Sequence, residues 1–325
     1  MAKCYFPGAN SGEGFYSRFS GIVPPCEKAH YTYVLKGGPG VGKNTLMKKV
    51  ASVAREGGYT VEEFRCASDP TSLDAVRVVE KGIVVLDGTA PHSIDPVLPG
   101  ICDEVIDLGY FKNQSEFAMM RQNVEELFLQ NKGYYRAAYS MLGAANKLKK
   151  EVLFALSQTI DKEKVGKFLS ELFANVQSGE KRELFARSAT PEGVIDYAET
   201  FLPIGTVAFS GIWGEAIMFF AKEMLFGKRC EVFYDFLVPD CPRTIAFDGG
   251  AIAVADGGDS AEKFFGNVAE HVPFLLEESE KLVAAACGEL SKALEAHDEI
   301  EKIYREYVDY TRVNEKASRL LEQVM

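Results

Sequence analysis

A run of glycines followed by one lysine, within residues 37–45, has the composition of a phosphate-binding loop. Glycines let the backbone turn so that several N–H groups face one anion, and a helix that starts there adds partial positive charge. Lys43 would contact the β- and γ-phosphates of a bound nucleotide. We therefore predict that a nucleotide is bound by Gly37, Gly38, Pro39, Gly40, Val41, Gly42, Lys43, Asn44 and Thr45.

The residue after this lysine is Asn44, in the position where such loops carry a Ser or Thr that binds Mg²⁺. Mg²⁺ requires near-octahedral ligands at about 2.0–2.1 Å, and the longer carboxamide would crowd the metal or leave the position to water. The backbone amides and Lys43 are unaffected, and hydrogen bonds to charged groups contribute about 1.5–3 kcal/mol each. We therefore expect nucleotide binding to survive better than phosphoryl transfer.

The elements that must position this loop follow in the required order. Residues 31–35 are β-branched and aromatic and predict a strand that ends at the glycines, and residues 45–56 predict the helix that follows. Residues 60–65 predict a second strand, residues 71–76 a short helix, and residues 83–87 a third strand. The third strand is apolar up to its last residue, as is typical of a buried parallel strand. The pattern indicates an α/β fold.

Asp87 ends the third predicted strand, at the edge of an open α/β sheet where ligands bind. We predict that Asp87 binds Mg²⁺ and takes part in catalysis with Lys43, the alternative being an ordinary acid before a turn. Gly88 follows it, so a general base in that position is absent. Other side chains that could position a water molecule are Asp69, Asp74, Asp95 and His92, none of which stands out by spacing.

ATP is the nucleotide that we expect. GTPases carry an Asn-Lys-x-Asp element for guanine, and the nearest stretch here, residues 146–149, ends in lysine. Adenine sites often use stacking and backbone contacts that leave no sequence signature.

Composition limits the remaining classes of function. The chain has 325 residues, enough for two domains, and its net charge of -11 argues against nonspecific nucleic-acid binding. The seven cysteines are scattered without metal-like spacing, as expected for reduced thiols in the cytoplasm. No signal-peptide pattern is visible, and the most apolar helical run, residues 216–226, contains Lys222 and Glu223. We expect a soluble, cytoplasmic protein that is not bound to a membrane.

The second half of the chain repeats the first. Residues 6–15 are echoed by residues 185–194, and residues 83–88 by residues 252–257, the latter placing Asp256 where the first copy has Asp87. The second copy of the loop region, residues 207–218, has no lysine and carries Glu215, which would repel a phosphate. We therefore predict one phosphate site, in the first copy, and interpret Asp256 as inherited without a role.

Each copy is followed by a long stretch with apolar residues at helical spacing among charges. We predict two tandem P-loop NTPase-like three-layer domains with parallel sheets. The first spans residues 1–180, with a helical arm at about 115–178, and the second spans residues 181–325, with an arm at about 268–325. The arms would pack on each other or on the domains, or bind a protein partner.

Three strings, residues 36–43, 66–74 and 86–92, together with the tandem repeat, resemble a poorly characterised bacterial family of double P-loop ATPase-like proteins. The resemblance covers nearly the whole chain. It implies a nucleotide-binding α/β domain carried twice, with helical insertions, and an ATPase without a defined substrate. Family members typically have Ser at position 44 and a recognisable second loop at residues 212–218, so both departures indicate weakened catalysis.

Three functions follow from these observations. The first is a slow ATPase or ATP-dependent switch that uses Lys43 on the phosphates and Asp87 on Mg²⁺. The second is a pseudo-enzyme that binds nucleotide with little metal and acts as a sensor or scaffold through its arms. The third is a small-molecule or nucleotide kinase, for which Asp69 would be the candidate base.

Overall fold

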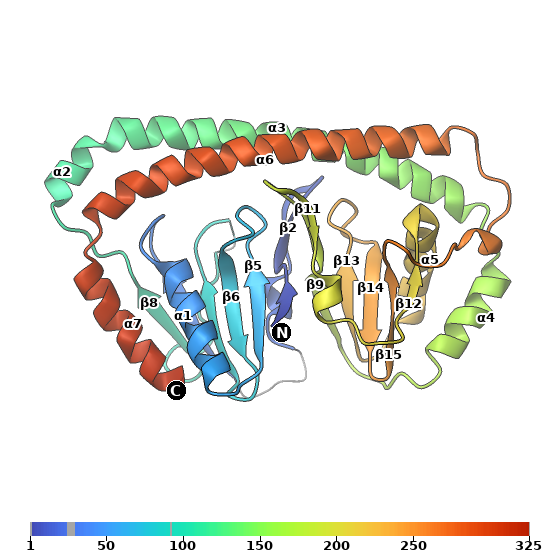
Figure 1. The fold of residues 1–325 in the computed structure, drawn as a ribbon, viewed down its shortest axis with the longest axis horizontal. Coiled ribbons are helices and arrows are strands. Elements are labelled where there is room, and N and C mark those ends of the chain that lie inside the picture. Colours follow the sequence, from blue (N-terminus) through green and yellow to red (C-terminus); the bar gives the residue numbers. More distant parts are fainter. Residues whose placement is uncertain (1, 25–29, 92, 325) are drawn as a thin grey trace.

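The computed structural model describes residues 2–24, 30–91 and 93–324. Two large β-sheets stand side by side, and two long helices run across both of them on one side (Figure 1). A four-stranded sheet lies between the two large sheets. The chain is therefore a mixed α/β protein in which the long helices connect two sheet units.

The first sheet contains six strands, in the order β1 (Lys3–Tyr5), β5 (Val61–Arg65), β6 (Leu73–Val78), β7 (Ile83–Asp87), β4 (Tyr31–Lys36) and β8 (Asp103–Asp107). Strand β6 is antiparallel to both of its neighbours, and the other pairs are parallel. The prediction of an all-parallel sheet is therefore wrong. Helix α1 (Lys43–Glu56) packs against this sheet.

The helix predicted for residues 71–76 is also wrong, because Leu73–Val78 form strand β6. Only residues 66–72 connect β5 to β6, whereas a parallel crossover needs about a dozen residues or more. The chain therefore turns back and pairs antiparallel with β5. The branched side chains of Val76 and Val78 suit this buried strand.

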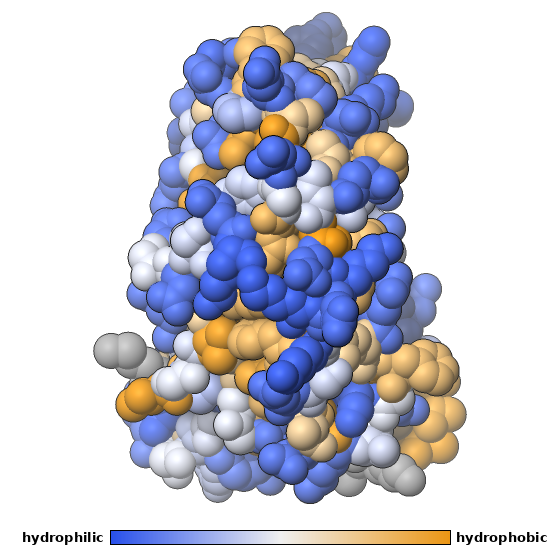
Figure 2. Space-filling model, turned by 90° about the vertical axis from the view of Figure 1, so that its right-hand side faces the viewer, coloured by the Kyte–Doolittle hydropathy of each residue, from blue (hydrophilic) through white to orange (hydrophobic). Residues whose placement is uncertain are grey.

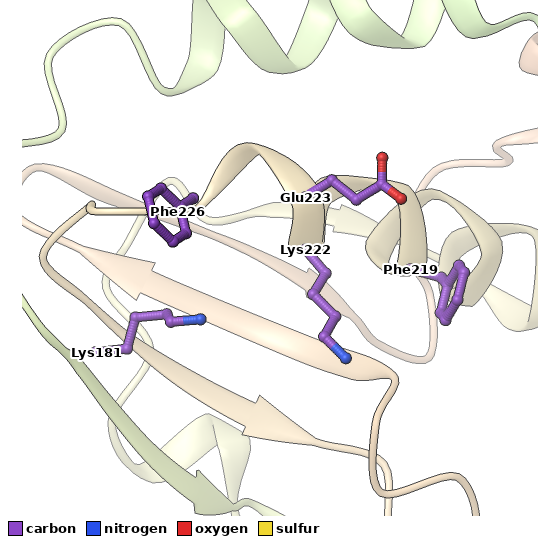
Figure 3. A pocket seen from close by; sticks show the side chains of 5 residues that line it. All are labelled: Lys181, Phe219, Lys222, Glu223 and Phe226. Carbon is purple, nitrogen blue, oxygen red and sulfur yellow. The ribbon is translucent and has the colours of Figure 1, made fainter.

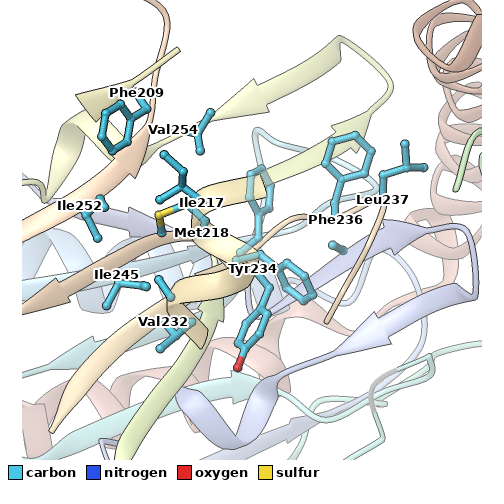
Figure 4. Packing of buried hydrophobic residues seen from close by; sticks show 14 of the residues in the cluster. Phe209, Ile217, Met218, Val232, Tyr234, Phe236, Leu237, Ile245, Ile252 and Val254 are labelled. Atoms are coloured by element: carbon cyan, nitrogen blue, oxygen red, sulfur yellow. The ribbon is translucent and has the colours of Figure 1, made fainter. Parts of the chain in front are cut away.

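The second sheet has five strands, in the order β12 (Val207–Phe209), β15 (Gly250–Val254), β14 (Pro242–Phe247), β13 (Cys230–Tyr234) and β9 (Lys181–Phe185). Read from β9, this is the order β1-β5-β6-β7-β4 of the first sheet, and β14 is antiparallel to its neighbours as β6 is. The helix after β12 is α5 (Gly211–Met224). Its Ile217 and Met218 pack on Val232, Ile245 and Ile252 of the sheet (Figure 4).

The four-stranded sheet joins the two halves of the chain through segments that the repeat relates. Its order is β11 (Gly193–Asp196), β10 (Arg187–Thr190), β2 (Gly8–Ser11) and β3 (Gly14–Ser17), all antiparallel. Beside it, the amide of Phe6 donates to the carbonyl of Phe185 (2.8 Å), and the amide of Phe185 donates to that of Phe6 (3.1 Å). Equivalent residues of the two copies thus pair with each other, as across an approximate two-fold axis.

A buried ion-pair network also crosses this junction. Arg182 of β9 donates to both carboxylate oxygens of Glu62 (3.0 and 2.8 Å) and to Glu231 (2.8 Å), and Arg77 donates to Glu62 (2.8 Å). The side chains of Arg182 and Glu62 are only 4% and 6% exposed. Burial alone would raise the pKa of Glu62, but its hydrogen bonds and ion pairs with Arg182 and Arg77 hold the pKa below its usual value. The network fixes the two sheets relative to each other.

The helical arms pack on each other. The helices that follow the first sheet are α2 (Gln114–Met119), α3 (Arg121–Ser157) and α4 (Lys162–Leu172), and those that end the chain are α6 (Val272–Tyr307) and α7 (Tyr310–Val324). Helices α3 and α6 lie side by side along their length (Figure 1). Ser279 of α6 donates to the carbonyl of Ala145 in α3 (3.1 Å), and Asn131 of α3 donates to that of Ala293 in α6 (2.7 Å). Helix α6 thus extends from the second sheet to the first, where α7 packs on α1.

The described part of the chain also contains short 3-10 helices at Phe19–Gly21, Ala198–Thr200 and Glu262–Phe264. At the end of the molecule beyond the second sheet, hydrophilic residues cover most of the surface, with smaller hydrophobic groups between them (Figure 2). None of the helices in the described residues has the length and apolar character needed to cross a membrane. The cysteines in these residues have free thiols, and Cys26 lies outside them.

Candidate functional site

The glycine loop, residues 37–42, connects β4 to α1 and is shaped by backbone angles that only glycine adopts readily. Gly37, Gly40 and Gly42 have φ values of 146°, 70° and 98°. Gly42 is the residue before the first turn of α1 and has no side chain to cap it. The first amides of α1 therefore have no partner within the helix and can donate to an anion.

Lys43 and Asp87 meet behind this loop. The Nζ atom of Lys43 donates to the carbonyls of Gly37 (2.7 Å) and Gly38 (3.0 Å) and lies 3.6 Å from Oδ2 of Asp87. The residues come together because β4 and β7 are parallel neighbours with Leu35 opposite Asp87. Oδ1 of Asp87 accepts hydrogen bonds from the amide (2.9 Å) and the hydroxyl (2.5 Å) of Thr89. An ammonium group and a carboxylate thus share the carboxyl edge of two neighbouring parallel strands, where ligands bind in open α/β sheets.

Asn44 has both ends of its carboxamide engaged by the turn before β6. Its Nδ2 donates to the hydroxyl of Ser72 (2.8 Å), and its Oδ1 accepts from the amide of Leu73 (3.1 Å). These bonds tie the first turn of α1 to the start of β6. In this arrangement the carboxamide serves as a structural link between the two elements. Thr45, the last residue of the predicted loop, is exposed on α1.

The residues around the loop are better suited to a Mg²⁺ ion that is bound to a nucleotide than to a Mg²⁺ ion by itself. Within residues 2–24, 30–91 and 93–324, no three His, Cys, Asp or Glu side chains form a group that could hold a metal ion. Mg²⁺ usually keeps several waters and takes one or two carboxylates together with substrate phosphates. Asp87 beside Lys43 can supply such a carboxylate.

The other carboxylates considered from the sequence have different surroundings. Asp69 accepts hydrogen bonds from the amide (3.0 Å) and hydroxyl (2.7 Å) of Thr71 and from the hydroxyl of Ser72. It is therefore linked to Asn44 through Ser72. Asp95 is exposed and lies 3.3 Å from Nζ of Lys36.

Asp74 is buried in β6. Burial raises the pKa of the nearby Cys66 thiol, and the charge of Asp74 raises it further. His92 lies outside the described residues. Asp69 has a hydrogen-bonded path to the predicted loop, through Ser72 and Asn44.

Residues at the junction of α6 and α7 cover the glycine loop. The amide of Gly40 donates to Oε1 of Glu301 (3.3 Å), and the hydroxyl of Tyr310 donates to the carbonyl of Gly40 (2.8 Å). The ring of Tyr304 lies so close to Gly38 that a Cβ added there would be 2.9 Å from it.

The sequence predicts helical arms but not this contact. Apolar residues recur along the whole of α6 at the same spacing, so no local signal marks the turn that meets the loop. His297 lies on the same helix, and its Nε2 atom is 3.6 Å from Oε1 of Glu301.

The second copy lacks the loop. Ser210 alone separates β12 from α5. Glu215 is not at the mouth of a phosphate site but is buried in α5, where its carboxylate pairs with Arg243 (2.6 Å) and Lys149 (2.8 Å). Asp256 follows the end of β15. A phosphate would find neither a glycine loop nor a lysine equivalent to Lys43 here.

A surface hollow of about 300 Å³ lies on the second sheet unit, away from the glycine loop. It is lined by Lys181, Phe219, Lys222, Glu223 and Phe226 (Figure 3). Phe226 is 93% exposed, so the hollow is open to solvent. No residue of the loop contributes to it.

Comparisons with known proteins identify no relative. No protein-family model, no curated protein and no solved structure matches the chain. The residues and distances of the glycine loop therefore carry the functional inference.

Proposed function

We propose that the first half of the chain is a P-loop NTPase-like unit that binds ATP at the glycine loop and acts as a nucleotide-dependent switch with slow hydrolysis. The observation that carries this proposal is the 3.6 Å approach of Lys43 Nζ to Asp87 Oδ2 behind a loop that requires glycine. When ATP binds, Lys43 exchanges two carbonyls for the β- and γ-phosphates. Asp87 holds the nucleotide-bound Mg²⁺ directly or through water.

Weak hydrolysis follows from the residue at position 44. Asn44 has no hydroxyl, and both ends of its carboxamide are hydrogen-bonded to the turn before β6. Mg²⁺ therefore lacks one of the usual protein ligands of such sites. Gly88 after Asp87 also leaves that position without a general base.

The same bonds of Asn44 favour a second candidate function, that of a pseudo-enzyme. The glycine amides, the N-terminus of α1 and Lys43 can hold phosphates without a metal. Such a protein would bind ATP or ADP with little dependence on Mg²⁺ and transmit its state through the arms. The resemblance of the loop motifs to double P-loop ATPase-like proteins supports nucleotide binding under both functions. The kinase remains the third proposal, with Asp69 as its base.

Calorimetric titration of ATP and ADP, with and without Mg²⁺, tests these functions on the unmodified chain and on Lys43→Ala. Binding that is weaker in Lys43→Ala supports the site, and turnover with Mg²⁺ in the unmodified chain identifies the switch with hydrolysis. Binding without turnover identifies the pseudo-enzyme. Absence of heat with either nucleotide rejects all three proposals, and two nucleotides per chain would contradict the loss of the second loop.

A further inference from the structure

The junction of α6 and α7 contacts every second residue of the glycine loop from Gly38 to Gly42. A Cβ added at Gly40 would lie 3.0 Å from the carbonyl oxygen of Glu301, so the backbone of α6 touches the loop. A Cβ at Gly38 would meet the ring of Tyr304 at 2.9 Å, and a Cβ at Gly42 would lie 3.9 Å from Val313. The segment of residues 301–313 is therefore in van der Waals contact with the loop.

Glu301 also makes the polar contact that a phosphate would make. Its Oε1 accepts a hydrogen bond from the Gly40 amide (3.3 Å), as a phosphate oxygen does from the amides of such a loop. A hydrogen bond from His297 and the charge of Arg305 lower the pKa of Glu301, although burial opposes them. The group that faces the amide at neutral pH is a carboxylate, so it would repel an incoming phosphate.

We infer that residues 301–313 form an autoinhibitory lid in which the Glu301 carboxylate takes the place of a nucleotide phosphate at the Gly40 amide. Nucleotide binding at the loop, the function proposed above, then requires the lid to open. The hydroxyl of Tyr310 donates a hydrogen bond to the Gly40 carbonyl (2.8 Å) and so also stabilises the closed state.

Opening of the lid couples nucleotide affinity to the arms. The apparent affinity for a ligand falls with the fraction of molecules in the competent state, and the ligand shifts that fraction in return. Loss of one charge-assisted hydrogen bond to the closed state would raise ATP affinity by about tenfold to a hundredfold. Because α6 runs along α3 to the second sheet, the opened lid can report nucleotide binding to that part of the molecule.

The test uses the full chain and the variants Glu301→Ala and Tyr310→Phe, with Glu299→Ala as the matched control. Glu299 lies on the same helix and pairs with Lys302, and both side chains are exposed. We expect Glu301→Ala to bind ATP about tenfold to a hundredfold more tightly, Tyr310→Phe to shift affinity in the same direction, and the control to bind as the unmodified chain does. Hydrogen exchange of residues 301–313 should become faster in Glu301→Ala without nucleotide and in the unmodified chain with ATP.

The outcomes separate the lid from the nucleotide site itself. If all variants bind ATP with equal affinity and hydrogen exchange at residues 301–313 is unchanged, the lid proposal is wrong, whereas the proposed nucleotide site is unaffected. Lower turnover at unchanged affinity in Glu301→Ala also overturns it, because Glu301 would then act in the reaction. Absence of ATP binding in every variant overturns both, since the lid was inferred for a nucleotide site.

Discussion

Replacement of Asn44 by serine should make the protein less stable while making its ATP binding more dependent on Mg²⁺. Serine supplies the hydroxyl that Asn44 lacks, but its short side chain cannot bridge to Ser72 and Leu73. The amide of Leu73, a residue only 3% exposed, would lose its acceptor. A buried polar group left without a partner costs about 1–3 kcal/mol.

The cost in stability can be measured apart from the gain in metal binding. Asn44→Ala loses the same two hydrogen bonds without adding a hydroxyl, so both variants should unfold with a free energy lower by about 1–3 kcal/mol. Because one kcal/mol corresponds to about 2–4 °C in domains of 150–250 residues, the melting temperature should fall by several degrees. Urea denaturation gives the free energy directly, and far-UV circular dichroism checks that the fold is retained.

The effect of Mg²⁺ on ATP affinity should differ between Asn44→Ser and Asn44→Ala. In Asn44→Ser we expect Mg²⁺ to tighten ATP binding by at least about tenfold, equivalent to about 1.4 kcal/mol, and turnover to rise with it. In Asn44→Ala and in the unmodified chain the effect of Mg²⁺ should be small. Calorimetry with ATP at fixed Mg²⁺ concentrations measures this. The same Mg²⁺ dependence in the serine and alanine variants would refute the reasoning on position 44, and unchanged stability in both would refute the structural role of the Asn44 bonds.

Three further predictions concern the loop lysine and the junction of the two halves. Lys43→Ala should weaken ATP binding in calorimetry by about tenfold to a hundredfold, whereas Lys48→Ala, which removes an exposed lysine of the same helix, should not. Arg182→Ala should lower the unfolding free energy in urea by about 3–5 kcal/mol, because Glu62 would stay buried without its main partner. Arg121→Ala, which breaks an exposed pair, should leave the urea midpoint nearly unchanged, because solvent and salt screen such a pair. The pKa of Glu62 is held below its usual 4.5, so its stabilisation is complete above that pH and is lost as the pH falls through the folded-state pKa. Glu62→Gln should therefore flatten the acid limb of a plot of unfolding free energy against pH, and an unchanged acid limb would contradict the assignment.

The elements around the loop could be predicted because their signals are local. Residues 31–35 and 83–87 are short runs of mainly β-branched, aromatic and apolar residues that end close to a glycine, and strands β4 and β7 occupy them to within one residue. The helix after the loop begins at Lys43, two residues earlier than predicted, since a helix can start at the glycine that ends the loop.

The wrong prediction, a helix at residues 71–76, rests on a local pattern that occurs both at helix starts and in turns. Ser72 and Asp74 lie near the start of the helix predicted for residues 71–76, where such residues are common. In the structure Asp69 accepts hydrogen bonds from Thr71 and Ser72 and stabilises the turn between two strands instead. The partners of Asn44 could not be predicted either, because Ser72 reaches it only once β6 has paired with β5. The sequence of this segment alone does not distinguish the start of a capped helix from a turn between two strands.

The arms are held by different kinds of contact at their two ends. Near the second sheet, Lys149 of α3 forms buried ion pairs with Glu215 (2.8 Å) and Asp235 (3.1 Å). Breaking one partner of such a buried pair costs about 3–5 kcal/mol.

Near the first sheet, Glu301 is 24% exposed. There the α6–α7 connection is held by backbone hydrogen bonds from Lys112 to Tyr307 (2.8 Å) and from Asp309 to Tyr110 (2.8 Å). Intramolecular hydrogen bonds contribute about 0.5–1.5 kcal/mol each, and Val308 and Val313, buried in the hydrophobic core of the first sheet, add apolar contacts. The copy of the repeat that keeps a glycine loop therefore lies under the end of the arms where, under the proposed lid, a bound triphosphate would have to displace Glu301 from the Gly40 amide.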